Sequence, residues 1–320
     1  MKILQTNKNF CTFLDQKCAH SLPLSFRSSI QYAGPKTDEW DSVKRQVQRA
    51  LEEFGCFEAK FDKIPTEIRK TIFGAMEELF DLPLEIKTRN VCELPYHGYL
   101  GQRPHAPLYE SIGFDDPHVA ENIEAQTRTF WAQGNTNFRK SIQSYTKQLK
   151  ELDQTVRRMI MESFQVEKYM DEHMDSSGYL VKVTKYKGPQ TIEKQVGLKA
   201  HTDINMLTIL YQNEVNGFGV QSSTGEWVEW EPSKHSFIVV IGECLHATCH
   251  RVMLSGDKPR YSIGLFSFPK LGYMIKAPEE LVDEEHPLLY KPFDYAQYLG
   301  FGFSNIGRYP QYDIRPYCGV

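Results

Sequence analysis

A chain of 320 residues is long enough for one large domain or two ordinary ones with a substantial core. Hydrophobic residues make up 41% and charged residues 24%, which excludes a disordered, collagen-like or coiled-coil protein. A net charge of -4 argues against nucleic acid as a partner, and no apolar stretch reaches the roughly 18 residues of a membrane helix.

The seven cysteines are scattered and contain no C-x-x-C pair, which excludes a zinc ribbon or a thioredoxin motif. A chain of this size does not need disulfides to complete its core, so we expect a reducing compartment and a cytoplasmic location. We also expect a monomer that binds a small molecule.

Residues 1–34 have an atypical composition for the start of a domain. They contain four Lys or Arg residues and a single acid, Asp15, and carry no continuous apolar stretch. This predicts a disordered leader or a weak transit peptide, with regular structure beginning at Pro35.

The front of the chain, residues 35–175, is predicted to be helical. Thr37 can cap a helix that ends at Gly55, and the strand Cys56–Phe61 follows. A second helix lies between Pro65 and Pro83. The segment 92–135 is rich in Gly, Pro and aromatic residues and is predicted to be a long functional loop. The third helix carries apolar residues at spacings of three and four from Phe138 to Ile160.

The back of the chain changes to short strands with turn signals and no helices between them. The predicted strands are Tyr179–Tyr186, Leu207–Tyr211, Phe218–Val220, Trp227–Trp230, Ser236–Ile241, His250–Leu254 and Arg260–Phe268. This pattern predicts an α+β fold with an antiparallel barrel or jelly roll in residues 176–270. With a C-terminal segment, 271–320, it forms one domain spanning residues 35–320.

Two short motifs carry the chemistry. In a strand, His201 and Asp203 would point to the same face, and His250 could add a third ligand. Two histidines and one carboxylate leave open positions on octahedral iron, as Fe(II) oxygenases require. Arg260 and Ser262 again share one strand face, where a guanidinium and a hydroxyl could grip a carboxylate.

These motifs together resemble the plant iron(II)/2-oxoglutarate-dependent dioxygenases. Within them, Gly55-Cys56-Phe57-Glu58-Ala59, His97-Gly98-Tyr99-Leu100 and Leu108-Tyr109-Glu110-Ser111 are similar to the AOP branch, which includes enzymes of glucosinolate side chains and relatives of unassigned substrate. The resemblance implies a double-stranded β-helix with an N-terminal helical layer.

The resemblance also implies a set of site residues and cofactors. Fe(II) would bind to His201, Asp203 and His250, and 2-oxoglutarate to Arg260 and Ser262 with Tyr186 nearby. O2 would complete the reaction, with ascorbate as a reductant, and succinate and CO2 would accompany hydroxylation, desaturation or dealkylation of a small specialised metabolite. His97, Tyr99 and Tyr109 could face that substrate.

The chain departs from the family pattern between Ile241 and His250. This segment lacks the usual Ser-Asn-Gly-Arg turn and is shorter by roughly eight residues, about a strand with its turn. His246 shares the strand parity of His250 and is a fallback ligand.

Three other functions stay open from the sequence. The same iron site could take electrons from ascorbate, or the shortened segment could leave a non-catalytic jelly-roll protein. A zinc hydrolase is disfavoured, because no carboxylate lies where a base for metal-bound water would be recognisable.

Overall fold

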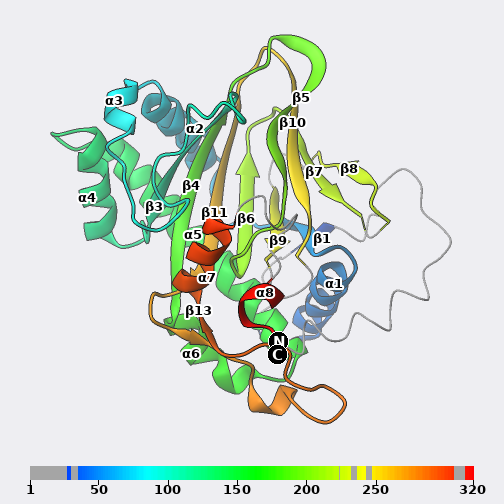
Figure 1. The fold of residues 1–320 in the computed structure, drawn as a ribbon. Helices are drawn as coiled ribbons and strands as arrows, with labels where there is room; N and C mark the ends of the chain where they lie inside the picture. The colour runs from blue at the N-terminus through cyan, green and yellow to red at the C-terminus, as the bar shows by residue number, and fades with distance from the viewer. Residues whose placement is uncertain (1–26, 30–34, 223, 232–235, 243–246, 306–313) are drawn as a thin grey trace.

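Two β-sheets form the centre of the protein (Figure 1). The computed structural model describes residues 27–29, 35–222, 224–231, 236–242, 247–305 and 314–320. The major sheet has the order β1-β2-β9-β6-β11-β4-β3, the minor sheet has the order β5-β10-β7-β8, and β12 pairs with β13. The strands are β1 (Arg27–Ser29), β2 (Cys56–Lys60), β3 (Tyr109–Asp115), β4 (Ser177–Tyr186), β5 (Thr191–His201), β6 (Leu207–Gln212), β7 (Phe218–Gln221), β8 (Trp227–Glu229), β9 (Ser236–Ile241), β10 (His250–Gly256), β11 (Arg260–Pro269), β12 (Met274–Ile275) and β13 (Phe293–Asp294).

The chain contains helices that pack against one face of the major sheet and others that lie elsewhere. They are α1 (Asp38–Phe54), α2 (Thr66–Phe80), α3 (Leu84–Lys87), α4 (Ala120–Phe130), α5 (Thr136–Ser163), α6 (Met170–Asp175), α7 (Tyr295–Ser304) and α8 (Arg315–Cys318), with short 3₁₀ turns at η4 (Glu167–Tyr169) and η5 (Glu279–Leu281). Residues of α1, α2 and α5 share the largest hydrophobic core with β4, β6, β9 and β11. This shared core favours the predicted single domain. Among the described residues, no helix is both long and apolar enough to cross a bilayer.

Local capping explains where the main helices begin and end. The hydroxyl of Thr37 accepts a hydrogen bond from the Trp40 backbone N–H at 3.2 Å, and Gly55 ends α1 in the left-handed conformation with φ 64°. The Asn135 side chain caps α5 through the Phe138 N–H at 3.0 Å. The predicted helices and the seven predicted strands are therefore confirmed, with small shifts at their ends.

Alternation along β4 and β11 separates the two faces of the major sheet. Val181, Val183, Ile263 and Leu265 face the helices and belong to the large core. The intervening residues face the minor sheet, with Arg260 paired to Tyr186 and Ser262 paired to Thr184 across the strands. The polar residues of the site thus come from the barrel-facing side of the same strands whose other side is core.

Three predictions about regular structure need correction. The segment 92–135 is not one loop, because it contains β3 and α4. Regular structure begins before Pro35, because β1 pairs in parallel with β2. The strand β5 was not predicted, because most of its residues are exposed and it lacks apolar alternation. The remaining leader residues, 1–26 and 30–34, lie outside the described part of the chain.

A buried ion pair within the long helix α5 also forms hydrogen bonds to β4. Asp153 and Arg157 are 0% and 3% exposed, and the Arg157 Nε donates to Asp153 Oδ2 at 2.9 Å. Arg157 also donates to the Tyr179 hydroxyl at 2.8 Å and to the Ser177 hydroxyl at 2.7 Å, both on β4. This cluster fixes how α5 lies against the sheet.

Replacing Asp153 with Ala should destabilise the protein by about 3–5 kcal/mol, because the Arg157 charge would stay buried without its partner. Chemical denaturation measures the change in the free energy of unfolding. Glu151→Ala on the same helix, which breaks an exposed pair with Lys63, is the control and should cost under about 1 kcal/mol. Equal effects of the two substitutions would contradict this role of the cluster.

Candidate active site

His201, Asp203 and His250 converge at one point between the two sheets. His201 ends β5, His250 begins β10, and the two residues are direct partners in the antiparallel register. The Nε2 atoms of both histidines lie 3.8 Å from Asp203 Oδ1, and the ring centroids are 4.2 Å apart. One ligand atom from each residue lies within 4.8 Å of the other two. This donor set and spacing fit a divalent iron held by two imidazoles and one carboxylate.

The route by which Asp203 reaches this point differs from the expected one. The strand β5 ends at His201, so Asp203 lies in the turn toward β6 rather than two residues along a strand. The end of β9 presses on this turn, because a Cβ on Gly242 would lie 1.8 Å from the Asn205 carbonyl oxygen. Backbone contact at Gly242 therefore holds the turn that carries Asp203.

Hydrogen bonds orient all three side chains. The Nδ1 atoms of His201 and His250 lie 2.9 and 3.0 Å from the carbonyl oxygens of Lys199 and Thr248. Donation from Nδ1 leaves the Nε2 lone pair free for a metal. The Thr208 hydroxyl donates to Asp203 Oδ2 at 2.7 Å, which leaves Oδ1 toward the histidines.

The surroundings of His201 favour the neutral form of its imidazole. Burial, followed by the adjacent His250, lowers the pKa of His201 to about 4, while Asp203 opposes the shift. A neutral imidazole is the form that coordinates a metal.

The Arg260 guanidinium is a buried charge without a carboxylate partner among the described residues. It is 2% exposed and donates to Gln212 Oε1 at 2.7 Å and to the Ser262 hydroxyl at 3.4 Å. Its Nε has no hydrogen-bond partner. Burial lowers the pKa of this guanidinium from its ordinary value, yet arginine remains charged in proteins. An unpaired buried cation beside a hydroxyl fits the distal carboxylate of a dicarboxylate such as 2-oxoglutarate.

Tyr186 connects the arginine to the strands that carry the histidines. The Arg260 guanidinium lies 5.2 Å from the centre of the Tyr186 ring, and Tyr186 packs with Val252 and Leu254 of β10. A Cβ on Gly197 of β5 would lie 3.0 Å from the Tyr186 ring, so glycine permits this approach. The guanidinium and the histidine strands therefore face the same interior.

The three residues expected to face substrate lie in different places. Tyr109 packs edge-on against Tyr186 with 5.5 Å between centroids, so it is next to Arg260. Tyr99 donates to Glu110 Oε1 and packs against the core on the helix side of the sheet. His97 is 3% exposed and its Nδ1 lies 2.5 Å from Asp115 Oδ1. The structure therefore brings only Tyr109 to the guanidinium.

Although the connection before His250 is short, His250 lies opposite His201 in the register of β5 and β10. Residues 243–246 of this connection, including His246, lie outside the described part of the chain. Thr248 donates to the Phe54 carbonyl, and the Gln221 N–H donates to the Cys249 carbonyl at 2.8 Å. These bonds anchor the two residues directly before the strand, and β10 begins at His250 itself.

Two contributors, Thr208 and Gln212, were missed by sequence reasoning. Both belong to β6, and β11 pairs Gln212 with Ser262. Gln212 is a polar residue at the end of an apolar strand, and only the register with β11 gives it a partner. Thr208 bonds instead to Asp203, five residues earlier in the chain.

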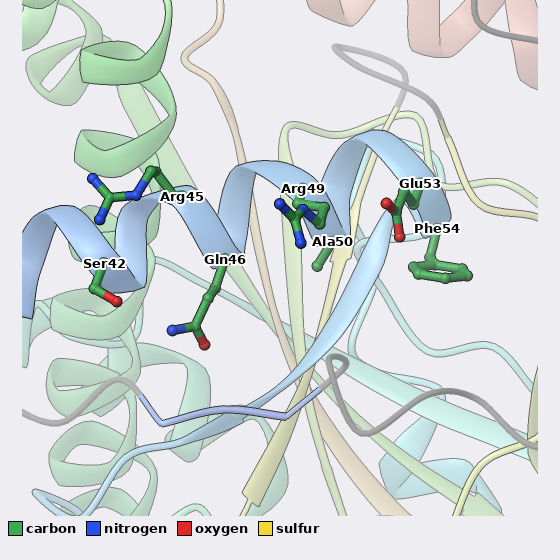
Figure 2. A pocket seen from close by; sticks show the side chains of 7 residues that line it. All are labelled: Ser42, Arg45, Gln46, Arg49, Ala50, Glu53 and Phe54. Carbon is green, nitrogen blue, oxygen red and sulfur yellow. The ribbon is translucent and has the colours of Figure 1, made fainter. Parts of the chain in front are cut away.

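A separate hollow lies along the outside of α1 (Figure 2). Its volume is about 310 Å³, and the described residues that line it all lie on α1, namely Ser42, Arg45, Gln46, Arg49, Ala50, Glu53 and Phe54. It contains none of the residues of the histidine or arginine clusters, so it is not the site described above.

Comparisons with known proteins agree with this arrangement. Residues 161–269 match the 2OG-Fe(II) oxygenase superfamily, and residues 28–109 match the family described as non-haem dioxygenase in morphine synthesis N-terminal. The probable 2-oxoglutarate-dependent dioxygenase AOP1.2 of Arabidopsis thaliana is 44% identical over 88% of this chain and 91% of its own length. The 2-oxoglutarate-dependent dioxygenase AOP2 of the same plant is 31% identical over 95% of this chain and 99% of its own length.

Solved structures share the fold. The rice dioxygenase for auxin oxidation has a TM-score of 0.77 at 25% identity, covering 92% of this chain and 99% of that chain. The structure of JOX2 in complex with 2OG, Fe and JA has a TM-score of 0.71 at 23% identity, covering 89% and 90%. The predicted jelly roll with an N-terminal helical region is thereby confirmed, and this chain belongs to the 2-oxoglutarate-dependent dioxygenases, a family of Fe(II)-dependent oxygenases.

Proposed function

We propose that this chain oxidises a small specialised metabolite, with His201, Asp203 and His250 holding Fe(II) and Arg260 and Ser262 holding 2-oxoglutarate. The observation that carries the proposal is the convergence of three metal-ligand atoms in the same interior as a buried arginine that lacks a carboxylate. Neither feature contributes to folding as efficiently as apolar residues would, which favours a functional reason for both.

The clamp residues have distinct tasks in this proposal. The Arg260 guanidinium and the Ser262 hydroxyl bind the distal carboxylate of 2-oxoglutarate, and Gln212 holds the guanidinium in place by its 2.7 Å bond. The Tyr186 and Tyr109 rings form an apolar wall that excludes water from this ion pair. Binding therefore removes the cost of an unpaired buried charge.

The metal ligands orient the reaction centre. Bound iron and 2-oxoglutarate together supply the activation of O2, with succinate and CO2 as co-products. The Nδ1 bonds of His201 and His250 keep both imidazoles fixed, and Thr208 keeps one oxygen of Asp203 toward the centre. Hydroxylation, desaturation or dealkylation of the substrate then depends on which C–H bond the pocket presents.

The substrate class is supported by relatives rather than by a bound molecule. The rice neighbour is a dioxygenase for auxin oxidation, and JOX2 is in complex with JA. Ile204, the neighbour of Asp203 in the chain, packs together with Tyr96 and Phe266 against one buried apolar cluster, which would suit an apolar part of a small molecule. A monomeric state, a cytoplasmic location and ascorbate as a reductant stay predictions.

An impaired enzyme is the second candidate, because one relative, 34% identical over 95% of this chain, is named a probable inactive 2-oxoglutarate-dependent dioxygenase AOP2. Anaerobic titration of the purified chain with Fe(II) and 2-oxoglutarate separates the two candidates. The metal-to-ligand absorption band supports the proposal, and a folded protein without this band supports the impaired one. Stoichiometric succinate excludes the enzyme that would take its electrons from ascorbate alone.

His201→Ala and Asp203→Ala should each abolish the conversion of 2-oxoglutarate to succinate, because two protein ligands cannot hold the iron in place. Succinate is quantified after incubation with Fe(II). The exposed His105→Ala is the control and should keep the parental rate. Normal turnover in either ligand variant would refute the iron assignment.

Arg260→Gln should raise the 2-oxoglutarate concentration needed for half-saturation by roughly 10- to 100-fold, since a charged hydrogen bond contributes about 1.5–3 kcal/mol. Saturation curves for 2-oxoglutarate measure this. Arg128→Gln, on the surface of α4, should leave the curve unchanged. Superimposable saturation curves for Arg260→Gln and the parent would refute the proposal that Arg260 binds 2-oxoglutarate.

Thr208→Val should weaken Fe(II) binding by about 10- to 100-fold, because the carboxylate of Asp203 loses the bond that orients it. Anaerobic Fe(II) titration gives the dissociation constant. Thr71→Val, on the exposed side of α2, serves as the comparison. If Thr208→Val binds Fe(II) as tightly as the parent does, Asp203 needs no such orientation.

A further inference from the structure

A second group of potential metal ligands lies apart from the iron ligands. Cys92, His97 and Asp115 each offer one ligand atom, and the three atoms lie within 4.8 Å of one another. The cluster shares no residue with the iron ligands or with the arginine clamp, and it includes His97, which the sequence predicted to face substrate. It combines a thiol, an imidazole and a carboxylate, a set that suits a borderline-soft divalent cation.

Two of the ligands come from one short closed loop. The Tyr99 N–H donates to the Asn90 carbonyl at 2.8 Å, so the chain between them folds back on itself. Cys92 and His97 lie in this loop with four residues between them, a spacing like that of ligand pairs in structural zinc sites. A Cβ on Gly98 would lie 2.7 Å from the Asn90 carbonyl oxygen, so the closure requires glycine.

The third ligand comes from the strand against which this loop presses. A Cβ on Gly113 of β3 would lie 2.1 Å from the His97 carbonyl oxygen, so the loop backbone touches the strand. Asp115 lies two residues further on the same face. Its backbone N–H donates to the Gln126 side-chain oxygen and its carbonyl accepts from the Gln126 side-chain nitrogen, both at 2.8 Å, which fixes the backbone that carries the carboxylate.

The separations are near those that a tetrahedral zinc ion requires. Cys92 Sγ lies 3.8 Å from Asp115 Oδ2, and His97 Nδ1 lies 2.5 Å from Asp115 Oδ1. Ligand atoms around tetrahedral zinc lie about 3.4–3.6 Å apart, so the His97–Asp115 pair must open by about 1 Å. The Asp115 side chain is 43% exposed and can make this movement, and solvent can supply a fourth ligand. The His97 ring is packed edge-on against Phe268 at 5.2 Å and needs no reorientation of its own.

We propose that Cys92, His97 and Asp115 bind Zn²⁺, with a water molecule as the fourth ligand. The thiol loses its proton to the solvent as the metal binds, and the charges of the thiolate and the carboxylate balance the cation.

A metal here would fix the loop that carries Tyr96. The Lys182 ammonium of β4 lies 5.7 Å from the centre of the Tyr96 ring, and Lys182 faces the barrel interior with Thr184 and Tyr186. Zinc would therefore brace one wall of the interior without taking part in the chemistry. The proposal of a zinc site does not depend on the proposed oxygenase activity.

Titration of the metal-free, full-length protein with Co²⁺ tests this site directly. A thiolate bound to Co²⁺ gives a charge-transfer absorption that imidazole and carboxylate ligands cannot give, so the iron ligands are silent in this measurement. We expect one equivalent of this band, displaced by added Zn²⁺, and its loss in Cys92→Ser. Cys249→Ser is the matched control, because Cys249 adjoins His250, and it should keep the band.

Asp115→Asn provides an independent arm and should weaken Co²⁺ binding at least tenfold while the band persists at saturation. Circular dichroism without metal establishes that each variant is folded. Absence of the band in the folded parent, or its persistence in Cys92→Ser, overturns the proposal and leaves His97 and Asp115 as a hydrogen-bonded pair that holds the loop to β3. Loss of the oxygenase activity in His201→Ala with the band intact would show that the two sites are separate.

Discussion

The antiparallel register between β5 and β10 is the constraint on which the site depends. It places His250 directly opposite His201, so the last residue of one strand and the first residue of the other offer their Nε2 atoms to a common point. A slip of one residue would turn the His250 side chain to the other face of the sheet. The bonds of Thr248 to Phe54 and of Cys249 to Gln221 keep this register despite the short connection.

Burial of Arg260 without a carboxylate shows how the fold prepares for a ligand. Removing a guanidinium from water is costly, and the bonds to Gln212 and Ser262 offset only part of the cost. The large apolar core on the opposite face of β4 and β11 supplies the stability that compensates for this desolvation cost. A dicarboxylate that enters the interior therefore finds a positioned cation and displaces little ordered structure.

A close backbone contact at a glycine lies beside each of the two groups of proposed ligand residues. Gly242 lets the end of β9 approach the turn that carries Asp203, and Gly113 lets the loop of His97 approach β3. Any larger residue would separate the backbones by the width of a side chain. The close backbone approach at these two positions therefore helps to place the residues that we propose as ligands.

The sequence by itself determined the helices with clear caps and apolar spacing, such as Thr37 to Gly55, and the chemical type of the site through His201, Asp203, His250, Arg260 and Ser262. Those signals are local, because each depends on residues a few positions apart. Only the tertiary structure decided that β5 is a strand, that Asp203 reaches its partners from a turn, and that Thr208 and Gln212 support the site. The strand β5 and the partner of Gln212 depend on pairing between segments about fifty residues apart, and a polar residue on an exposed strand carries no local sign of its partner. The bond from Thr208 to Asp203 spans only five residues, but it depends on the path of the turn between β5 and β6.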